Sequence, residues 1–129
     1  MRVRRFPGLF TSEYGYVRSD GREQAHLLIY WASFRCFGET FVIYRTPRQM
    51  LRKRPEAYAG WRVCHKATGY SLLADTVHEG RIVRRAYPTI REAVEVAEWV
   101  LRSVGAEKFS AAVAKARHVR RTATEAAHA

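Results

Sequence analysis

Residues 25–37, AHLLIYWASFRCF, constrain the fold more than any other stretch, because they are rich in aromatic and β-branched side chains. Such residues favour extended backbone, so we expect one long central strand here. One face of that strand would carry Leu28, Tyr30, Ala32, Phe34 and Cys36. The other face begins apolar, with Leu27, Ile29 and Trp31, and turns polar at Ser33 and Arg35. This pattern predicts a strand covered on both faces at its start and on one face at its end.

The clearest helix follows Pro88. Thr89 and Glu92 have the spacing of a capping box at a helix start, and Gly105 is typical of a helix end. Between them, apolar residues recur at helical spacing and form one stripe: Ile90, Ala93, Val94, Ala97, Val100, Leu101 and Val104. A further helix is expected from Glu107 to about Val119, with an inward face made of Phe109, Ala112, Val113 and Ala116.

Shorter elements surround these two. Residues 1–24 read as an extended arm leading into a hairpin, residues 40–44, 61–66, 70–73 and 81–86 as strands, and residues 74–80 as a polar loop. Thr46 and Pro47 begin a short helix that Pro55 ends. We therefore expect an α+β fold: an antiparallel sheet of about five or six strands, a short helix between hairpins, and one or two C-terminal helices packed on the sheet. Residues 1–121 would form a single domain and residues 122–129 a frayed tail.

The chain is strongly basic, with 23 Lys and Arg against 12 Asp and Glu and a net charge of +11. Most of the basic residues are arginines, whose planar guanidinium suits bidentate contact with phosphate or carboxylate and stacks on bases. This favours an anionic partner, with nucleic acid first. A genome that prefers Arg to Lys everywhere is an alternative, which explains the choice of Arg better than it explains the shortage of acids.

Basic residues that could contact such a partner fall in three groups. Residues 45–54 contain five basic side chains and no acidic one, and Arg48 and Arg52 share a helix face at i and i+4. Such a stripe can straddle a phosphate backbone, although a solvated surface helix would look the same. A second basic pair lies at residues 84 and 85, and a third group comprises Arg2, Arg4 and Arg5. The predicted binding residues are Arg45, Arg48, Arg52, Lys53, Arg54, Arg84 and Arg85.

Catalytic chemistry has little support in the sequence. His78 lies near Asp75 and Glu79 and could take part in acid–base chemistry, but solvated charge is the simpler interpretation. Cys64 and His65 are adjacent on an expected strand, so their side chains should point to opposite faces and not form a dyad. We expect no enzyme, no catalytic residue, no metal and no cofactor.

The two cysteines, Cys36 and Cys64, each lie among apolar neighbours in an expected strand. Two isolated cysteines make neither a zinc site nor a disulfide framework, so buried free thiols in a cytoplasmic protein are expected. No apolar run is long enough to cross a membrane, and the basic first residues lack the apolar run of a signal peptide. Contact with a membrane is therefore not expected.

One sequence pattern carries a resemblance. Residues 61–69, WRVCHKATG, are followed later by Thr89, Glu92, Ala93 and Ala97. The chain thus resembles small accessory domains of phages and plasmids, in which a W-x-V-x-H-x-x-T-G hairpin precedes a T-x-x-E-A helix. The resemblance covers about a third of the chain and implies a mobile-element context, which includes DNA-binding factors and anti-CRISPR inhibitors. It implies no catalytic residue.

Two functions remain open on the sequence. The first is a non-enzymatic accessory protein of a mobile element that binds nucleic acid through an arginine-rich face. The alternative is a protein inhibitor of the anti-CRISPR type, whose basic face docks on an acidic protein or nucleoprotein surface. The same arginines would bind either kind of partner, so the sequence does not decide between the two functions. It also leaves the oligomeric state open.

Overall fold

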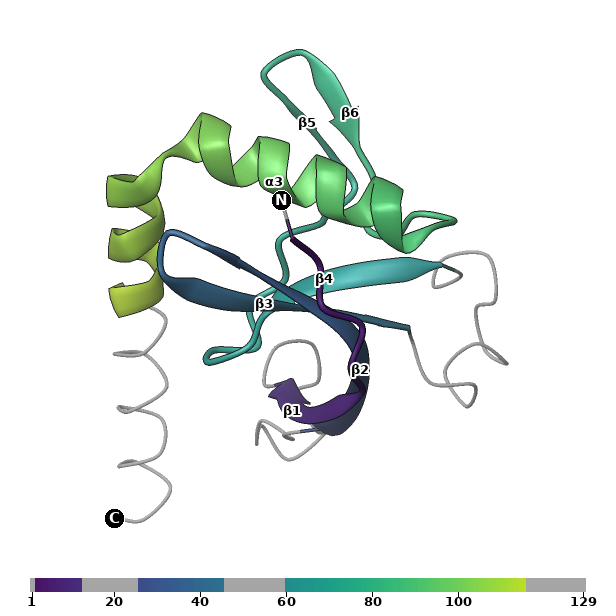
Figure 1. Ribbon diagram of the computed structural model, residues 1–129. Helices are drawn as coiled ribbons and strands as arrows, with labels where there is room; N and C mark the ends of the chain where they lie inside the picture. The colour runs from purple at the N-terminus through teal and green to yellow at the C-terminus, as the bar shows by residue number, and fades with distance from the viewer. Residues whose placement is uncertain (1, 13–25, 46–59, 116–129) are drawn as a thin grey trace, which may run out of the picture.

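The computed structural model describes residues 2–12, 26–45 and 60–115 (Figure 1). Within these residues, four antiparallel strands form one sheet in the order β1-β2-β3-β4. The strands are β1 (Gly8–Ser12), β2 (His26–Cys36), β3 (Glu39–Arg45) and β4 (Trp61–His65). Each strand therefore pairs with its neighbour in the chain, and the long apolar strand expected from residues 25–37 lies inside the sheet between β1 and β3.

A β-bulge at Trp31 divides β2 between two apolar clusters. Tyr30 pairs with Tyr44, whereas Ala32 pairs with Ile43, so one extra residue lies between the two pairs. Because the bulge interrupts the alternation, Tyr30 and Ala32 point to opposite faces of the sheet. The sequence expectation that Leu28 to Cys36 share one face is therefore wrong.

The larger cluster lies between the sheet and the helices. Its sheet residues include Ala32, Phe34, Phe41, Ile43 and Val63, all at most 2% exposed. The smaller cluster lies on the other face, where β1 and the first half of β2 curl beneath β3 and β4 (Figure 1). It contains Phe10, Val42, Tyr44 and Cys64.

The outer face of the β1–β2 ribbon is exposed. Leu27, Ile29 and Trp31, expected to be covered, are each more than half exposed. The bulge explains why, since it curls this part of β2 around the smaller cluster. The helices pack on the larger cluster, which lies on the other face of the sheet. An apolar surface is left facing solvent.

The main helix is α3 (Ile90–Val104), and it crosses the sheet on the side of the larger cluster (Figure 1). The Thr89 side chain accepts a hydrogen bond from the Glu92 backbone N–H at 3.1 Å, and Gly105 ends the helix with φ 88°, as the sequence predicts. Residues 106–115 form a further helix, here called the second helix, which turns away sharply from α3. Phe109 and Val113 are buried as expected, but Ala112 is exposed.

Two strands form a separate hairpin rather than extending the main sheet. They are β5 (Thr76–His78) and β6 (Arg81–Val83), and the hairpin projects beyond α3 (Figure 1). β5 lies inside the stretch expected to be a loop. Glu79 and Gly80 both have positive φ, 47° and 78°, which matches the right-handed twist of a two-residue hairpin turn.

The remaining strand expectations are only partly met. Residues 70–73 run beside β4 through a single bridge between Cys64 and Ser71, and they do not form a strand. The Ser71 hydroxyl donates to the Leu73 carbonyl at 2.9 Å, and this local bond competes with strand pairing. The α+β class is correct, but in place of the single sheet of five or six strands the described residues form one sheet of four strands and one of two.

Several expectations fall outside the described residues. These are the hairpin around residues 19–21, the short helix at residues 47–54, residues 116–119 of the expected C-terminal helix, and the tail at residues 122–129.

Candidate functional site

Arg45 and Trp61 face each other where β3 ends and β4 begins. They are partners in the strand register, and the Arg45 guanidinium carbon lies 4.1 Å from the centroid of the Trp61 ring. Arg45 is exposed and Trp61 is half-buried. The ring therefore holds the guanidinium by a cation–π contact and leaves its N–H groups directed to solvent, where an anion can reach them.

A second segment joins this edge of the sheet at Tyr87. The Trp61 backbone N–H donates to the Tyr87 carbonyl at 2.7 Å, and the Tyr87 N–H donates back to Trp61 at 2.9 Å. Gly60 makes this approach possible, because a Cβ on it would stand 2.7 Å from the Tyr87 carbonyl oxygen. Its φ of 108° also suits only glycine.

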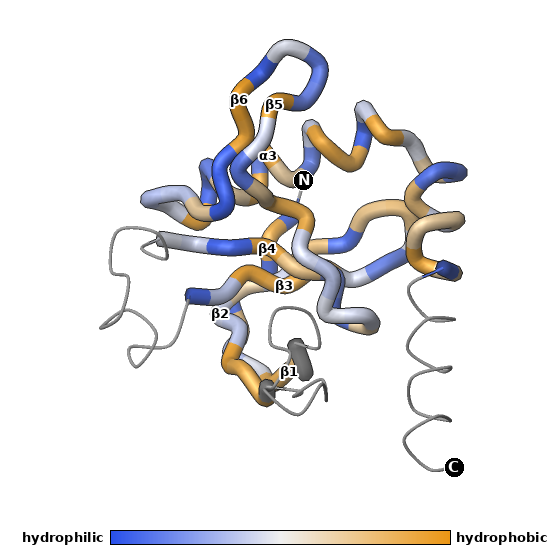
Figure 2. The backbone as a smooth tube through the Cα atoms, turned by 180° about the vertical axis from the view of Figure 1, so that it is seen from behind, coloured by the Kyte–Doolittle hydropathy of each residue, from blue (hydrophilic) through white to orange (hydrophobic). Residues whose placement is uncertain are grey.

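The same bridge brings Arg84 to the edge. The Arg84 backbone N–H donates to the Tyr87 hydroxyl at 3.1 Å, and Arg84 is exposed. Hydrophilic stretches at the end of β3, early in β4 and after β6 lie on the same side of the molecule (left in Figure 2). We call the surface made by Arg45, Trp61, Arg84 and Tyr87 the arginine edge.

Arg85 is held by an acidic side chain instead. Its backbone N–H donates to Asp75 Oδ1 at 2.9 Å and its Nε to Oδ2 at 2.7 Å. The backbone hydrogen bond, followed by the guanidinium, holds the pKa of Asp75 below its ordinary value. Arg85 thus fixes the segment that leads into the arginine edge, and part of its charge is neutralised there.

The structure accounts for three of the seven predicted binding residues. Arg45 and Arg84 reach the same edge, and Arg85 lies beside it on Asp75. Arg48, Arg52, Lys53 and Arg54 lie outside the described residues, in the stretch between Arg45, which belongs to this edge, and Gly60, which precedes Trp61. The third basic group is elsewhere, on the N-terminal arm, where Arg5 lines a hollow with Glu95 and Glu98 of α3.

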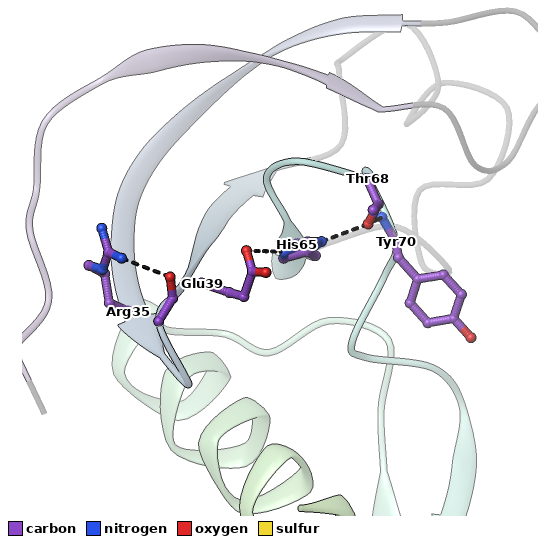
Figure 3. Close-up of polar contacts among 6 residues, drawn as sticks. Arg35, Glu39, His65, Thr68 and Tyr70 are labelled. Carbon is purple, nitrogen blue, oxygen red and sulfur yellow. Dashed lines mark hydrogen bonds and ion pairs between the residues drawn. The ribbon is translucent and has the colours of Figure 1, made fainter. Parts of the chain in front are cut away.

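The W-x-V-x-H-x-x-T-G pattern forms a buried polar network (Figure 3). His65, only 1% exposed, contacts Thr68 Oγ1 through Nδ1 at 2.8 Å and Glu39 Oε2 through Nε2 at 3.0 Å. A carboxylate only accepts hydrogen bonds, so Nε2 carries the proton toward Glu39, while Nδ1 bonds to the Thr68 hydroxyl. The Tyr70 N–H also donates to Thr68 Oγ1, at 3.3 Å. The network ties the β3 start to the turn after β4.

The loop residues considered for acid–base chemistry do not converge. His78 Nε2 lies 2.6 Å from Ser103 Oγ and its ring meets Trp99 edge-on, while Asp75 binds Arg85. Cys64 and His65 point to opposite faces, as the sequence predicts: the Cys64 thiol donates to the Tyr44 hydroxyl at 3.2 Å. Cys36 and Cys64 are free and belong to different clusters.

Within residues 2–12, 26–45 and 60–115, no three His, Cys, Asp or Glu side chains gather as metal ligands. No helix in that part of the chain is long and apolar enough to cross a membrane. Comparison with family models, curated proteins and solved structures found no match to this chain.

Trp61 and Tyr87 were missed as members of the site. The sequence analysis gives Trp61 only as the first residue of an expected strand and gives Tyr87 no role. The available signal was local: each aromatic residue adjoins a residue with restricted or special backbone, Gly60 before Trp61 and Pro88 after Tyr87. Such neighbours indicate chain segments that meet closely rather than an ordinary strand interior.

Proposed function

We propose that this protein is a non-enzymatic accessory protein that binds nucleic acid through the arginine edge, in the mobile-element context that the sequence resemblance implies. The observation that carries the proposal is that two exposed arginines adjoin the bridged aromatic pair Trp61 and Tyr87: the Arg45 guanidinium stacks on Trp61, and the Arg84 backbone N–H donates to the Tyr87 hydroxyl. Guanidinium groups bind phosphates, and stacking on an aromatic ring holds the Arg45 guanidinium in place for such a contact.

The charge of the whole molecule supports the same proposal. A net charge of +11 attracts a polyanion over distances comparable with the Debye length and speeds the encounter. The arginine edge would then set the orientation. Arg48, Arg52, Lys53 and Arg54 remain part of the proposed contact on the sequence, since their segment starts from Arg45.

The test is fluorescence anisotropy with labelled single-stranded and duplex oligonucleotides over a range of salt concentrations. Binding should weaken steeply with salt, because each neutralised phosphate releases counterions. In the double variant Arg45→Glu/Arg84→Glu, the slope of log affinity against log salt should fall by about 2 for duplex and slightly less for single strands.

The matched control is Lys108→Glu/Lys115→Glu, which changes the net charge equally on the exposed side of the second helix. It should change the affinity much less than the arginine variant. Equal weakening by both variants would show that only the overall charge matters, and absence of binding at low salt would refute the proposal.

One observation favours the alternative, an inhibitor of the anti-CRISPR type. Val77 and Ile82 are cross-strand partners on the projecting β5–β6 hairpin, 66% and 71% exposed, and Ile82 lies two residues before Arg84. Exposed apolar pairs beside arginines are typical of protein interfaces. A pull-down from nuclease-treated host lysate separates the two functions: a partner retained by the wild type and lost with Val77→Ser/Ile82→Ser would favour the inhibitor.

A further inference from the structure

A pocket of about 310 Å3 opens between the second helix, the C-terminal half of α3 and the segment after β4. Its deep part is made of the buried residues Leu101, Phe109 and Val113, together with His65 and Thr68. Exposed lining residues, Tyr70, Ala74 and Ala112, mark the mouth. The pocket is separate from the arginine edge, since the two share no residue.

The lining is uncharged, although the protein carries +11. Among the lining residues that the structure describes there is no Asp, Glu, Lys or Arg. A charged ligand would lose its hydration here without gaining an ion pair. The uncharged lining therefore favours a neutral ligand.

The polar atoms of the floor are engaged with one another. His65 bonds to Thr68 and Glu39, and the Ser71 hydroxyl bonds to the Leu73 carbonyl. The Tyr70 ring extends away from the His65–Thr68 pair (Figure 3). Water entering the pocket would find few hydrogen-bond partners, and poorly hydrated apolar cavities bind apolar molecules instead.

The size of the pocket narrows the ligand further. A cavity of about 150 Å3 lined by apolar side chains is enough for benzene, so this pocket has room for roughly two fused rings. Phe109, which packs edge-on against His65 at 5.6 Å between ring centroids, offers an aromatic wall. Aromatic rings prefer such offset and edge contacts.

We infer that this pocket binds a small, neutral, aromatic molecule of about two fused rings. The inference goes beyond the proposed nucleic-acid contact and does not depend on it. The ligand enters past Ala112 and rests its rings against Phe109 and Leu101.

Two probes with the same rings and different charge test the inference: 2-naphthol, which is neutral at pH 7, and the anion 2-naphthoate. The neutral probe should bind with 1:1 stoichiometry, followed by naphthol fluorescence, and should shift the amide resonances of Leu72, Val100 and Val113. Its binding should not depend on salt, whereas general attraction of 2-naphthoate to the basic surface should be salt-sensitive.

Ala112→Phe fills the mouth, and Ala111→Phe is its matched control. Both alanines are exposed neighbours on the second helix, but only Ala112 lines the pocket. Ala112→Phe should weaken 2-naphthol binding roughly tenfold or more, equivalent to about 1.4 kcal/mol, while Ala111→Phe leaves it unchanged. Ala112→Leu is a smaller change with the same expected direction if the phenylalanine perturbs folding.

The inference is wrong if the wild type does not bind 2-naphthol, if Ala112→Phe binds it as well as Ala111→Phe does, or if 2-naphthoate occupies the same residues more tightly. Binding of a tryptophan-containing peptide at these resonances without binding of 2-naphthol would also overturn it, because the pocket would then be a docking site for a protein side chain.

Discussion

Replacing Gly60 by alanine should destabilise the protein more than the same change at any exposed turn glycine. Two contributions add at this position. The backbone, at φ 108°, lies in a region that side chains rarely adopt, which costs about 1–3 kcal/mol. The added Cβ would also stand 2.7 Å from the Tyr87 carbonyl oxygen, a backbone atom that cannot turn aside.

Relieving that contact separates Trp61 from Tyr87. The two hydrogen bonds between them, at 2.7 and 2.9 Å, then lengthen, and each contributes about 1 kcal/mol to stability. The free energy of unfolding should therefore fall by about 3–5 kcal/mol. The arginine edge should be damaged as well, since this bridge joins Trp61 to Tyr87, whose hydroxyl binds the Arg84 backbone N–H.

Gly80 provides the control, because it also has positive φ, 78°, but nothing lies within 4 Å of a Cβ built on it. Gly80→Ala should cost only the backbone contribution, about 1–2 kcal/mol. Urea unfolding followed by circular dichroism measures both variants, with unchanged dependence on urea concentration as the sign of a pure stability effect. If Gly60→Ala is no more destabilising than Gly80→Ala, the close approach of Tyr87 does not limit this position.

Three further predictions follow from single contacts. The pKa of Asp75 is lower in the folded protein than in the unfolded chain. The stability that this carboxylate contributes is therefore present above its unfolded-state pKa and is lost as the pH falls through its folded-state pKa. Unfolding curves for Asp75→Asn should show a weaker acid dependence than those of the wild type. Burial raises the pKa of Cys64 to about 11, so its thiol should react with a disulfide reagent only as fast as the protein unfolds. The half-buried Cys36 should react earlier. Labelling followed by mass spectrometry distinguishes the two cysteines, and early labelling of Cys64 would contradict its burial. Phe41 is fully buried between Phe34 and Phe109. Phe41→Ala should lower the free energy of unfolding by about 3–5 kcal/mol, measured by thermal unfolding. A loss below about 1 kcal/mol would show that neighbouring side chains move into the vacated space.

Helices and strands were predicted correctly where contacts between residues close in sequence determine them. Thr89 and Gly105 bound α3 because capping is a contact within one turn, and residues 26–45 form two paired strands because the chain reverses at Gly38. The hairpin β5–β6 was missed because Glu79 adopts positive φ, which its residue type does not indicate. The bulge at Trp31 was missed for a related reason: alternation in sequence carries no mark of an extra residue.

The candidate site was predictable in charge but not in geometry. Clusters of arginine can be counted in a sequence, and Arg45 and Arg84 do reach one edge. Their meeting depends on the bridge between Trp61 and Tyr87, 26 positions apart, which no local pattern specifies. The contact between Arg85 and Asp75 was not predicted either, because Asp75 lies in a stretch expected to be a solvated loop. In the structure the segment after β6 folds back on Asp75.

The extra residue at Trp31 bears on how this chain can change length during evolution. Losing Trp31 would leave every other residue of β2 with its present partner and on its present face, because Tyr30 and Ala32 already pair with consecutive residues of β3. What would be lost is the bend that curls β1 around the smaller cluster. Losing a residue elsewhere in β2, such as Ser33, would instead exchange the faces of its neighbours and expose Phe34. Natural variants with a shorter β2 should therefore lack the residue at position 31 and have a flatter sheet.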